Sequence, residues 1–139
     1  EKQGTWDLYL KEKQNLKVEV VSPNYFQAER SITHYEVIKT STCFTYLKLQ
    51  LKTGKKHQIR VHCAHAGHPI LGDKLYGSHI NPMQRIALHA YSLEFAHPMT
   101  KKLVKFIAPL PKQFETLGFF LSSTSLSTRE RDCKWNTTV

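Results

Sequence analysis

A strict alternation of apolar and polar residues marks the segment Cys43–Lys52. Three leucines at every second position alternate there with polar residues, in the order Leu47-Lys48-Leu49-Gln50-Leu51-Lys52. A period of two places successive side chains on opposite faces of a strand. The segment is therefore predicted to be a strand with one buried face and one wet, basic face, which is typical of an antiparallel sheet.

Shorter apolar runs predict four further strands. These are Leu16–Val21, His34–Lys39, Ser92–Phe95 and Leu103–Ile107. The last two are joined by the loop His97–Lys102 and should form a hairpin with a basic tip. Because strands dominate, the pattern predicts an α+β fold, with a mostly antiparallel or mixed sheet and few helices.

Helical periodicity is confined to two places. In the segment 57–66 the apolar positions fall at i, i+4 and i+7, at Ile59, Cys63 and Ala66. Gly67 suits the position just after a helix, and Pro69 prevents the helix from continuing. Phe114–Phe120 is predicted to be a last short helix.

The chain has 139 residues, a length for one domain, assigned here to residues 1–120. Residues 121–139 are rich in Ser and Thr with little apolar content, and this segment is predicted to be a disordered tail. No apolar run approaches the roughly 20 residues of a membrane helix, and the N-terminus lacks a signal-peptide core. The three cysteines are odd in number and widely spaced, which favours a reducing compartment, the cytoplasm, over a disulfide framework.

Positive charge is concentrated in the second part of the chain. Residues 1–36 hold five basic and six acidic residues, whereas residues 37–139 hold fifteen basic and five acidic ones. Between Val37 and Gly72 there is no acidic residue. A surface of one sign attracts a polyanion, usually nucleic acid, although a solvated basic face that aids solubility explains the charge equally well.

The segment Thr53-Gly54-Lys55-Lys56-His57-Gln58-Ile59-Arg60-Val61-His62 holds the candidate chemistry. A turn delivers basic residues to a helix start, where unpaired backbone N–H groups favour an anion. His57 and Arg60 are three residues apart and share a face, and Arg60 can pair bidentately with a carboxylate or phosphate. An ordinary surface helix with solvated charges remains the competing interpretation.

Two blocks of sequence resemble the RluA-type RNA pseudouridine synthases. Residues 53–77, TGKKHQIRVHCAHAGHPILGDKLYG, are similar to that family's TGR-x-HQ-[IL]-R-V-H … GHPI-x-GD-x-x-YG signature. Residues 85–100 resemble its R-x-x-LHA-x-x-L-x-F-x-HP-x-T block, and residues 28–37 resemble one of its strands more weakly. The resemblance spans residues 5–115 and implies the C-terminal portion of the pseudouridine synthase catalytic domain.

The resemblance implies an isomerase that converts uridine to pseudouridine in structured ribosomal or transfer RNA, without metal or organic cofactor. It places Arg60 beside the catalytic aspartate, which it orients and keeps ionised. Five neighbouring residues are candidates for RNA contact: Lys52, Lys55, Lys56, His57 and Gln58. For His57 and Gln58 a structural role is the alternative.

The chain departs from the family at the catalytic aspartate itself. The family's HR-L-D motif is not found around Asp7, Asp73 or Asp132, so this chain is predicted to be a fragment that lacks the nucleophile. A non-catalytic RNA-binding module of the same fold is the alternative. Such a fragment should expose a sheet edge and an apolar face, and therefore self-associate.

Histidines and a cysteine are dense between residues 57 and 68, which raises the alternative of a zinc site. Their spacing matches no closed four-ligand pattern, and the family signature accounts for them better. No metal, no cofactor and no membrane contact are therefore expected.

Overall fold

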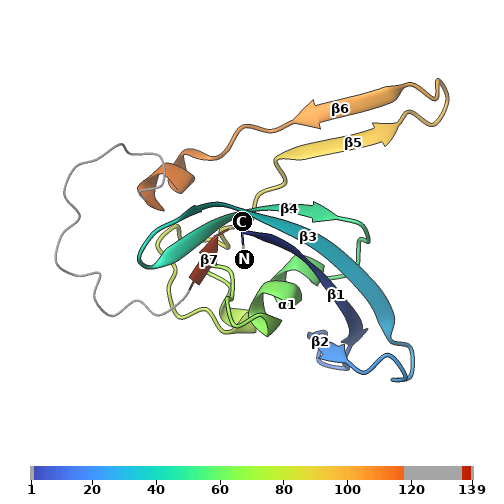
Figure 1. Ribbon diagram of the computed structural model, residues 1–139, viewed down its shortest axis with the longest axis horizontal. Helices are drawn as coiled ribbons and strands as arrows, with labels where there is room; N and C mark the ends of the chain where they lie inside the picture. The colour runs from blue at the N-terminus through green and yellow to red at the C-terminus, as the bar shows by residue number, and fades with distance from the viewer. Residues whose placement is uncertain (1, 118–135, 139) are drawn as a thin grey trace.

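The computed structural model describes residues 2–117 and 136–138 (Figure 1). Five strands form the main sheet in the order β2-β1-β3-β4-β7. Their bounds are β1 Gln3–Glu12, β2 Val18–Val21, β3 Glu29–Thr40, β4 Phe44–Leu51 and β7 Asn136–Thr138. The first four strands pair antiparallel, and β7 runs parallel to β4. The predicted α+β class with a mostly antiparallel sheet is confirmed.

The predicted strands are found at the expected positions, but most of their lengths differ from the prediction. β4 lies within the predicted Cys43–Lys52, whereas β3 begins at Glu29, five residues before the predicted His34–Lys39, in a part that pairs with β1. β1 itself was not predicted; Gly4 and Asp7, two residue types depleted in strands, interrupt its pattern. It forms between two partners, β2 and β3, whose hydrogen bonds override local preference.

The open face of the sheet carries charges of both signs. On β3 and β4 Lys48 lies 3.7 Å from Glu36, and across β1 and β3 Arg30 pairs with Asp7. The wet, basic face predicted for β4 is confirmed, since Lys48, Gln50 and Lys52 are exposed, whereas the open face of the whole sheet is mixed in charge. Strand pairing brings Glu36 of β3 beside Lys48 of β4, and Asp7 of β1 beside Arg30 of β3.

Helix α1, Gln58–His65, lies against the opposite face of the sheet (Figure 1). The structure confirms its position and the left-handed Gly67 beyond its end, at φ 84°. The predicted apolar stripe is only partly right, because Ala66 is exposed and the buried positions include two polar side chains, Gln58 and His62. The sheet beneath them presents hydroxyl groups, which these polar side chains bond.

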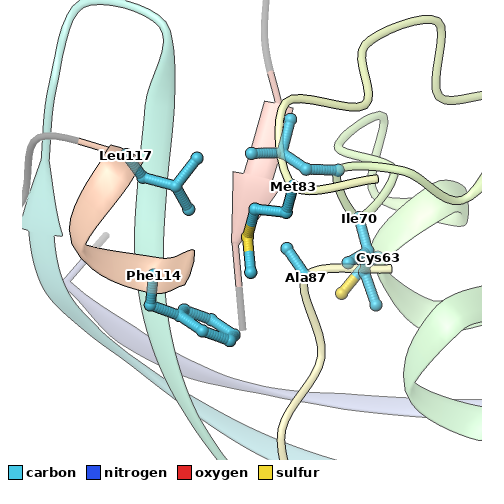
Figure 2. Close-up of a cluster of buried hydrophobic side chains, with 7 residues drawn as sticks. Cys63, Ile70, Met83, Ala87, Phe114 and Leu117 are labelled. Atoms are coloured by element: carbon cyan, nitrogen blue, oxygen red, sulfur yellow. The ribbon is translucent and has the colours of Figure 1, made fainter. Parts of the chain in front are cut away.

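The hydrophobic interior consists of two clusters. The larger joins α1, the loop that follows it and the 3-10 helix η2, Lys112–Leu117; Figure 2 labels Cys63, Ile70, Met83, Ala87, Phe114 and Leu117 in it. The smaller lies under β1 and β2 and consists of Leu10, Val18, Val61 and Tyr76. η2 begins two residues before the predicted Phe114–Phe120 helix, and residues 118–120 of that prediction lie outside the described residues. A second 3-10 helix, η1, spans Lys74–Tyr76.

Strands β5, Ser92–Ala96, and β6, Leu103–Ile107, form the predicted hairpin as a separate two-stranded sheet, which projects from the rest of the molecule (Figure 1). Register places four apolar side chains on one side of it, called here the apolar hairpin face: Leu93, Phe95, Val104 and Phe106. Leu93 and Phe106 are 60% and 57% exposed. In the described part of the chain this face has no covering layer.

Most of the predicted disordered tail, 121–139, lies outside the described residues, so that prediction stays a prediction; Asn136–Thr138 are described and form β7. No helix in the described ranges is long and apolar enough to cross a membrane.

Candidate active-site arginine and its surroundings

The start of α1 is fixed by the side chain of Gln58. Its Oε1 accepts hydrogen bonds from Thr53 Oγ1 (2.8 Å) and the Lys55 N–H (3.0 Å). Its Nε2 donates to the Ile32 carbonyl (3.0 Å) and to Thr33 Oγ1 (2.9 Å). One amide therefore ties the turn after β4 to strand β3 and sets where the helix begins. Gln58 is only 3% exposed, which supports the structural role among the two left open for it.

Arg60, two residues on, forms a bidentate ion pair with Asp73. Nε donates to Oδ2 at 2.7 Å and Nη2 donates to Oδ1 at 2.8 Å. The Asp73 carboxylate is fully buried, and 18% of the Arg60 side chain remains exposed. Hydrogen bonding to Asp73 raises the pKa of Arg60 above its ordinary value. The guanidinium is thus permanently charged and held in one orientation.

Tyr76 supports the same guanidinium from its flat side. Arg60 Cζ lies 4.9 Å from the centre of the Tyr76 ring, a cation–π distance. The Tyr76 hydroxyl accepts the Val18 N–H at 3.1 Å and lies 2.8 Å from His57 Nδ1. Tyr76 is therefore itself fixed, by β2 on one side and by the residue preceding α1 on the other.

His57 closes this group of residues. Its backbone is in the left-handed region, at φ 54°, which is unusual for a residue other than glycine. Burial, followed by the charge of Arg60, lowers the pKa of its imidazole below the ordinary value. At neutral pH the ring is therefore uncharged, and Nδ1 can accept a hydrogen bond from the Tyr76 hydroxyl.

The predicted RNA-contacting lysines lie on the surface beside this group. Lys55 pairs with Glu29 at 2.6 Å and Lys56 with Glu12 at 2.5 Å, each pair partly exposed. Lys52 is exposed and has no ion-pair partner in the part of the chain that the structure describes. Exposed ion pairs are worth about 1 kcal/mol or less, so a phosphate group can compete for these ammonium groups.

His62 and Cys63 lie deeper and do not belong to this surface. His62 Nε2 bonds Ser31 Oγ at 2.8 Å, and burial lowers the pKa of His62 to about 4. Burial raises the pKa of the Cys63 thiol to about 12, so the thiol stays protonated. The described residues contain no group of three or more His, Cys, Asp or Glu able to hold a metal ion.

Asp73 and Tyr76 were not predicted to act together with Arg60. Asp73 follows Arg60 by thirteen residues, and helical periodicity does not predict a contact at that separation in the sequence. One signal was available: Asp73 is the only acidic residue between Glu36 and Glu94, and so it is the carboxylate nearest to Arg60 in the sequence. Asp7, in contrast, pairs with Arg30 on the open face of the sheet, and Asp132 lies outside the described residues.

Residues 1–65 match the family described as RNA pseudouridylate synthase. Ribosomal large subunit pseudouridine synthase D of Haemophilus influenzae is 41% identical over 101 residues, covering 63% of this chain and 31% of that protein. An uncharacterized RNA pseudouridine synthase of Bacillus subtilis is 43% identical over 89 residues, covering 64% and 31%. The chain thus spans about a third of the length of these curated relatives.

Among solved structures, human RNA Pseudouridylate Synthase Domain Containing 1 has a similar fold. Its TM-score is 0.66 at 24% identity, covering 80% of this chain and 49% of that one. Human RNA Pseudouridylate Synthase Domain Containing 4 gives 0.58 at 23% identity, with 82% and 54% covered. The fold is therefore shared over most of the chain. The sequence matches make the chain similar, over the segments that they cover, to RNA pseudouridine synthases, in agreement with its RluA-type signature.

Proposed function

We propose that this chain supplies the arginine-bearing part of the active site of an enzyme that isomerises uridine to pseudouridine in ribosomal RNA. The observation that carries the proposal is Arg60, a charged guanidinium fixed by a buried carboxylate and still partly exposed. Its position in the family signature, and relatives named as ribosomal large subunit synthases, support the reaction and the substrate class.

The chemistry requires a second carboxylate, the nucleophile. It attacks the uridine nucleotide, the N-glycosidic bond breaks, and the uracil is reattached to the ribose through C5, so no atom is gained or lost. An arginine beside that carboxylate keeps it ionised and turned toward the sugar. Asp73 is not that nucleophile, because it is buried and both of its oxygens are bonded to Arg60. The nucleophile is proposed to come from an HR-L-D segment in a longer protein that contains this chain.

The target uridine must leave its stack to reach Arg60, at a cost of a few kcal/mol. Contacts to the RNA backbone offset that cost. Lys52, Lys55 and Lys56 lie at the turn that leads into α1 and provide positive charge beside the site. Structured RNA is thus the proposed partner, with transfer RNA as a second possible substrate and the cytoplasm as the proposed compartment.

A pseudouridine assay on ribosomal RNA fragments tests this function. It is run with this chain alone and with a version extended upstream by about 100 residues. Activity only in the extended form is the expected result. Salt-sensitive RNA binding in both, without activity in either, would indicate a non-catalytic binding module instead.

The role of Arg60 is tested in the extended form by Arg60→Ala, with Arg30→Ala as the matched control. Both variants remove an arginine that is bidentately paired with an aspartate, but only Arg60 lies at the proposed site. Loss of product with Arg60→Ala alone is expected. Full activity of Arg60→Ala would contradict the proposal.

A further inference from the structure

Asp73 holds Arg60 along one edge only. A guanidinium has five N–H groups. Asp73 takes the one on Nε and one on Nη2, which leaves two on Nη1 and the second on Nη2. No residue in the described ranges 2–117 and 136–138 is bonded to Nη1. Arg60 therefore keeps a second edge that is able to bind another carboxylate in the same bidentate manner.

This second edge is open to solvent. Among the described residues, His62 Nδ1 is the one buried side-chain nitrogen or oxygen without a hydrogen-bond partner, so Nη1 of Arg60 is not sealed inside. The 18% exposure of the Arg60 side chain agrees with this. The carboxylate that bonds the first edge is, in contrast, fully buried.

Two contacts fix the direction in which the open edge points. The bidentate bond to Asp73 prevents rotation within the guanidinium plane, and the Tyr76 ring, 4.9 Å away, limits tilting of that plane. Tyr76 is in turn fixed through its hydroxyl by Val18 and His57. A group held on one edge and one face loses little further freedom when the other edge binds a ligand.

We propose that Asp73 is a positioning residue. Its buried carboxylate binds the Nε and Nη2 edge of Arg60 and thereby orients the other edge, formed by Nη1 and Nη2, toward the nucleophilic carboxylate. This inference rests on the proposed function for the identity of that second carboxylate. It assigns to the GD part of the signature a task separate from RNA binding, since Asp73 cannot itself reach RNA.

The positioning is measured first on this chain, by NMR of its arginine Nε–H groups. In the wild type, the Arg60 Nε–H signal should exchange slowly with water, and Asp73→Asn should make it exchange at least 10-fold faster. Asp7→Asn is the matched control, since it loosens the equivalent exposed pair with Arg30 and should leave the Arg60 signal unchanged. An Arg60 signal that is the same in wild type and Asp73→Asn would overturn the proposal.

The consequence for catalysis is measured on the longer synthase. With Asp73→Asn, kcat should fall about 100-fold, the loss expected from a misplaced reacting group, while KM for RNA stays within twofold. Asp7→Asn should change neither. A kcat unchanged by Asp73→Asn, or a fall in RNA affinity in place of kcat, would overturn the positioning role.

A second variant covers the case in which Asp73→Asn does not fold. Arg60→Lys keeps the buried charge pair but has no second edge, so it should lose kcat to a similar extent; wild-type kcat in Arg60→Lys would overturn the proposal. If the wild-type synthase forms no pseudouridine, the proposed function fails, and the NMR comparison on this chain still decides the positioning.

Discussion

Gln58→Ala is predicted to cost this domain much of its stability without weakening its binding to RNA. The side chain makes four hydrogen bonds and is 3% exposed. In the variant the Ile32 carbonyl still accepts a hydrogen bond from the Lys52 N–H at 3.0 Å, so the loss of the Gln58 donor costs little at that carbonyl. The Lys55 N–H and the Thr53 hydroxyl each lose an acceptor.

The magnitude follows from those losses. Each of the two donors left without an acceptor costs about 1–3 kcal/mol, reduced where water can enter the turn. A total of about 3 kcal/mol is expected for the free energy of unfolding, which lowers Tm by about 10 °C for a chain of this size. The measurement is urea and thermal unfolding followed by circular dichroism. Gln50→Ala, at an exposed position of β4, is the control and should change stability by less than about 0.5 kcal/mol.

RNA affinity, measured well below Tm, separates the two roles considered for Gln58. A structural role predicts that the folded variant binds RNA within twofold of the wild type. If Gln58→Ala kept the stability of Gln50→Ala but lost RNA affinity, the structural reasoning would be refuted and Gln58 would be a direct RNA contact.

Three further predictions concern other parts of the chain. Gly72→Ala should lower the free energy of unfolding, measured in urea, by about 3 kcal/mol or more, because φ is 79° and an added Cβ would lie 2.2 Å from the Arg85 carbonyl oxygen. Gly54→Ala is the control and should be nearly neutral, because the space around Gly54 is open. Equal effects of the two substitutions would contradict this reasoning. His62 should lower the free energy of unfolding by up to about 3 kcal/mol as the pH falls from 6.5 to about 4, because its pKa is depressed in the folded state and the unfolded state binds more protons in that window. In His62→Gln the slope of the unfolding free energy against pH should be smaller. An unchanged slope would exclude His62 as its origin. Phe106→Glu, which places a charge on the apolar hairpin face, should reduce self-association of this chain in analytical ultracentrifugation, and wild-type chain that stays monomeric at high concentration would show that the face does not drive association.

The sequence by itself determined the elements whose signals are local. Alternation of leucines predicts β4, because a period of two has one structural meaning, and Gly67 and Pro69 end α1 where the backbone requires it. The RluA-type signature indicated the family and singled out Arg60. β1 was missed because Gly4 and Asp7 interrupt the alternation of Trp6, Leu8 and Leu10; pairing with β2 and β3 stabilises the strand despite them.

Only the tertiary structure decided how the site is built. Asp73 reaches Arg60 because the loop after α1 folds back beneath the helix, and no periodicity encodes that return. Strand pairing likewise places Glu36 beside Lys48 and makes the open face of the sheet mixed in charge. Contacts between residues distant in sequence depend on packing and hydrogen bonding between different elements. Local patterns of hydrophobic and polar residues do not specify those interactions, so only the tertiary structure shows them.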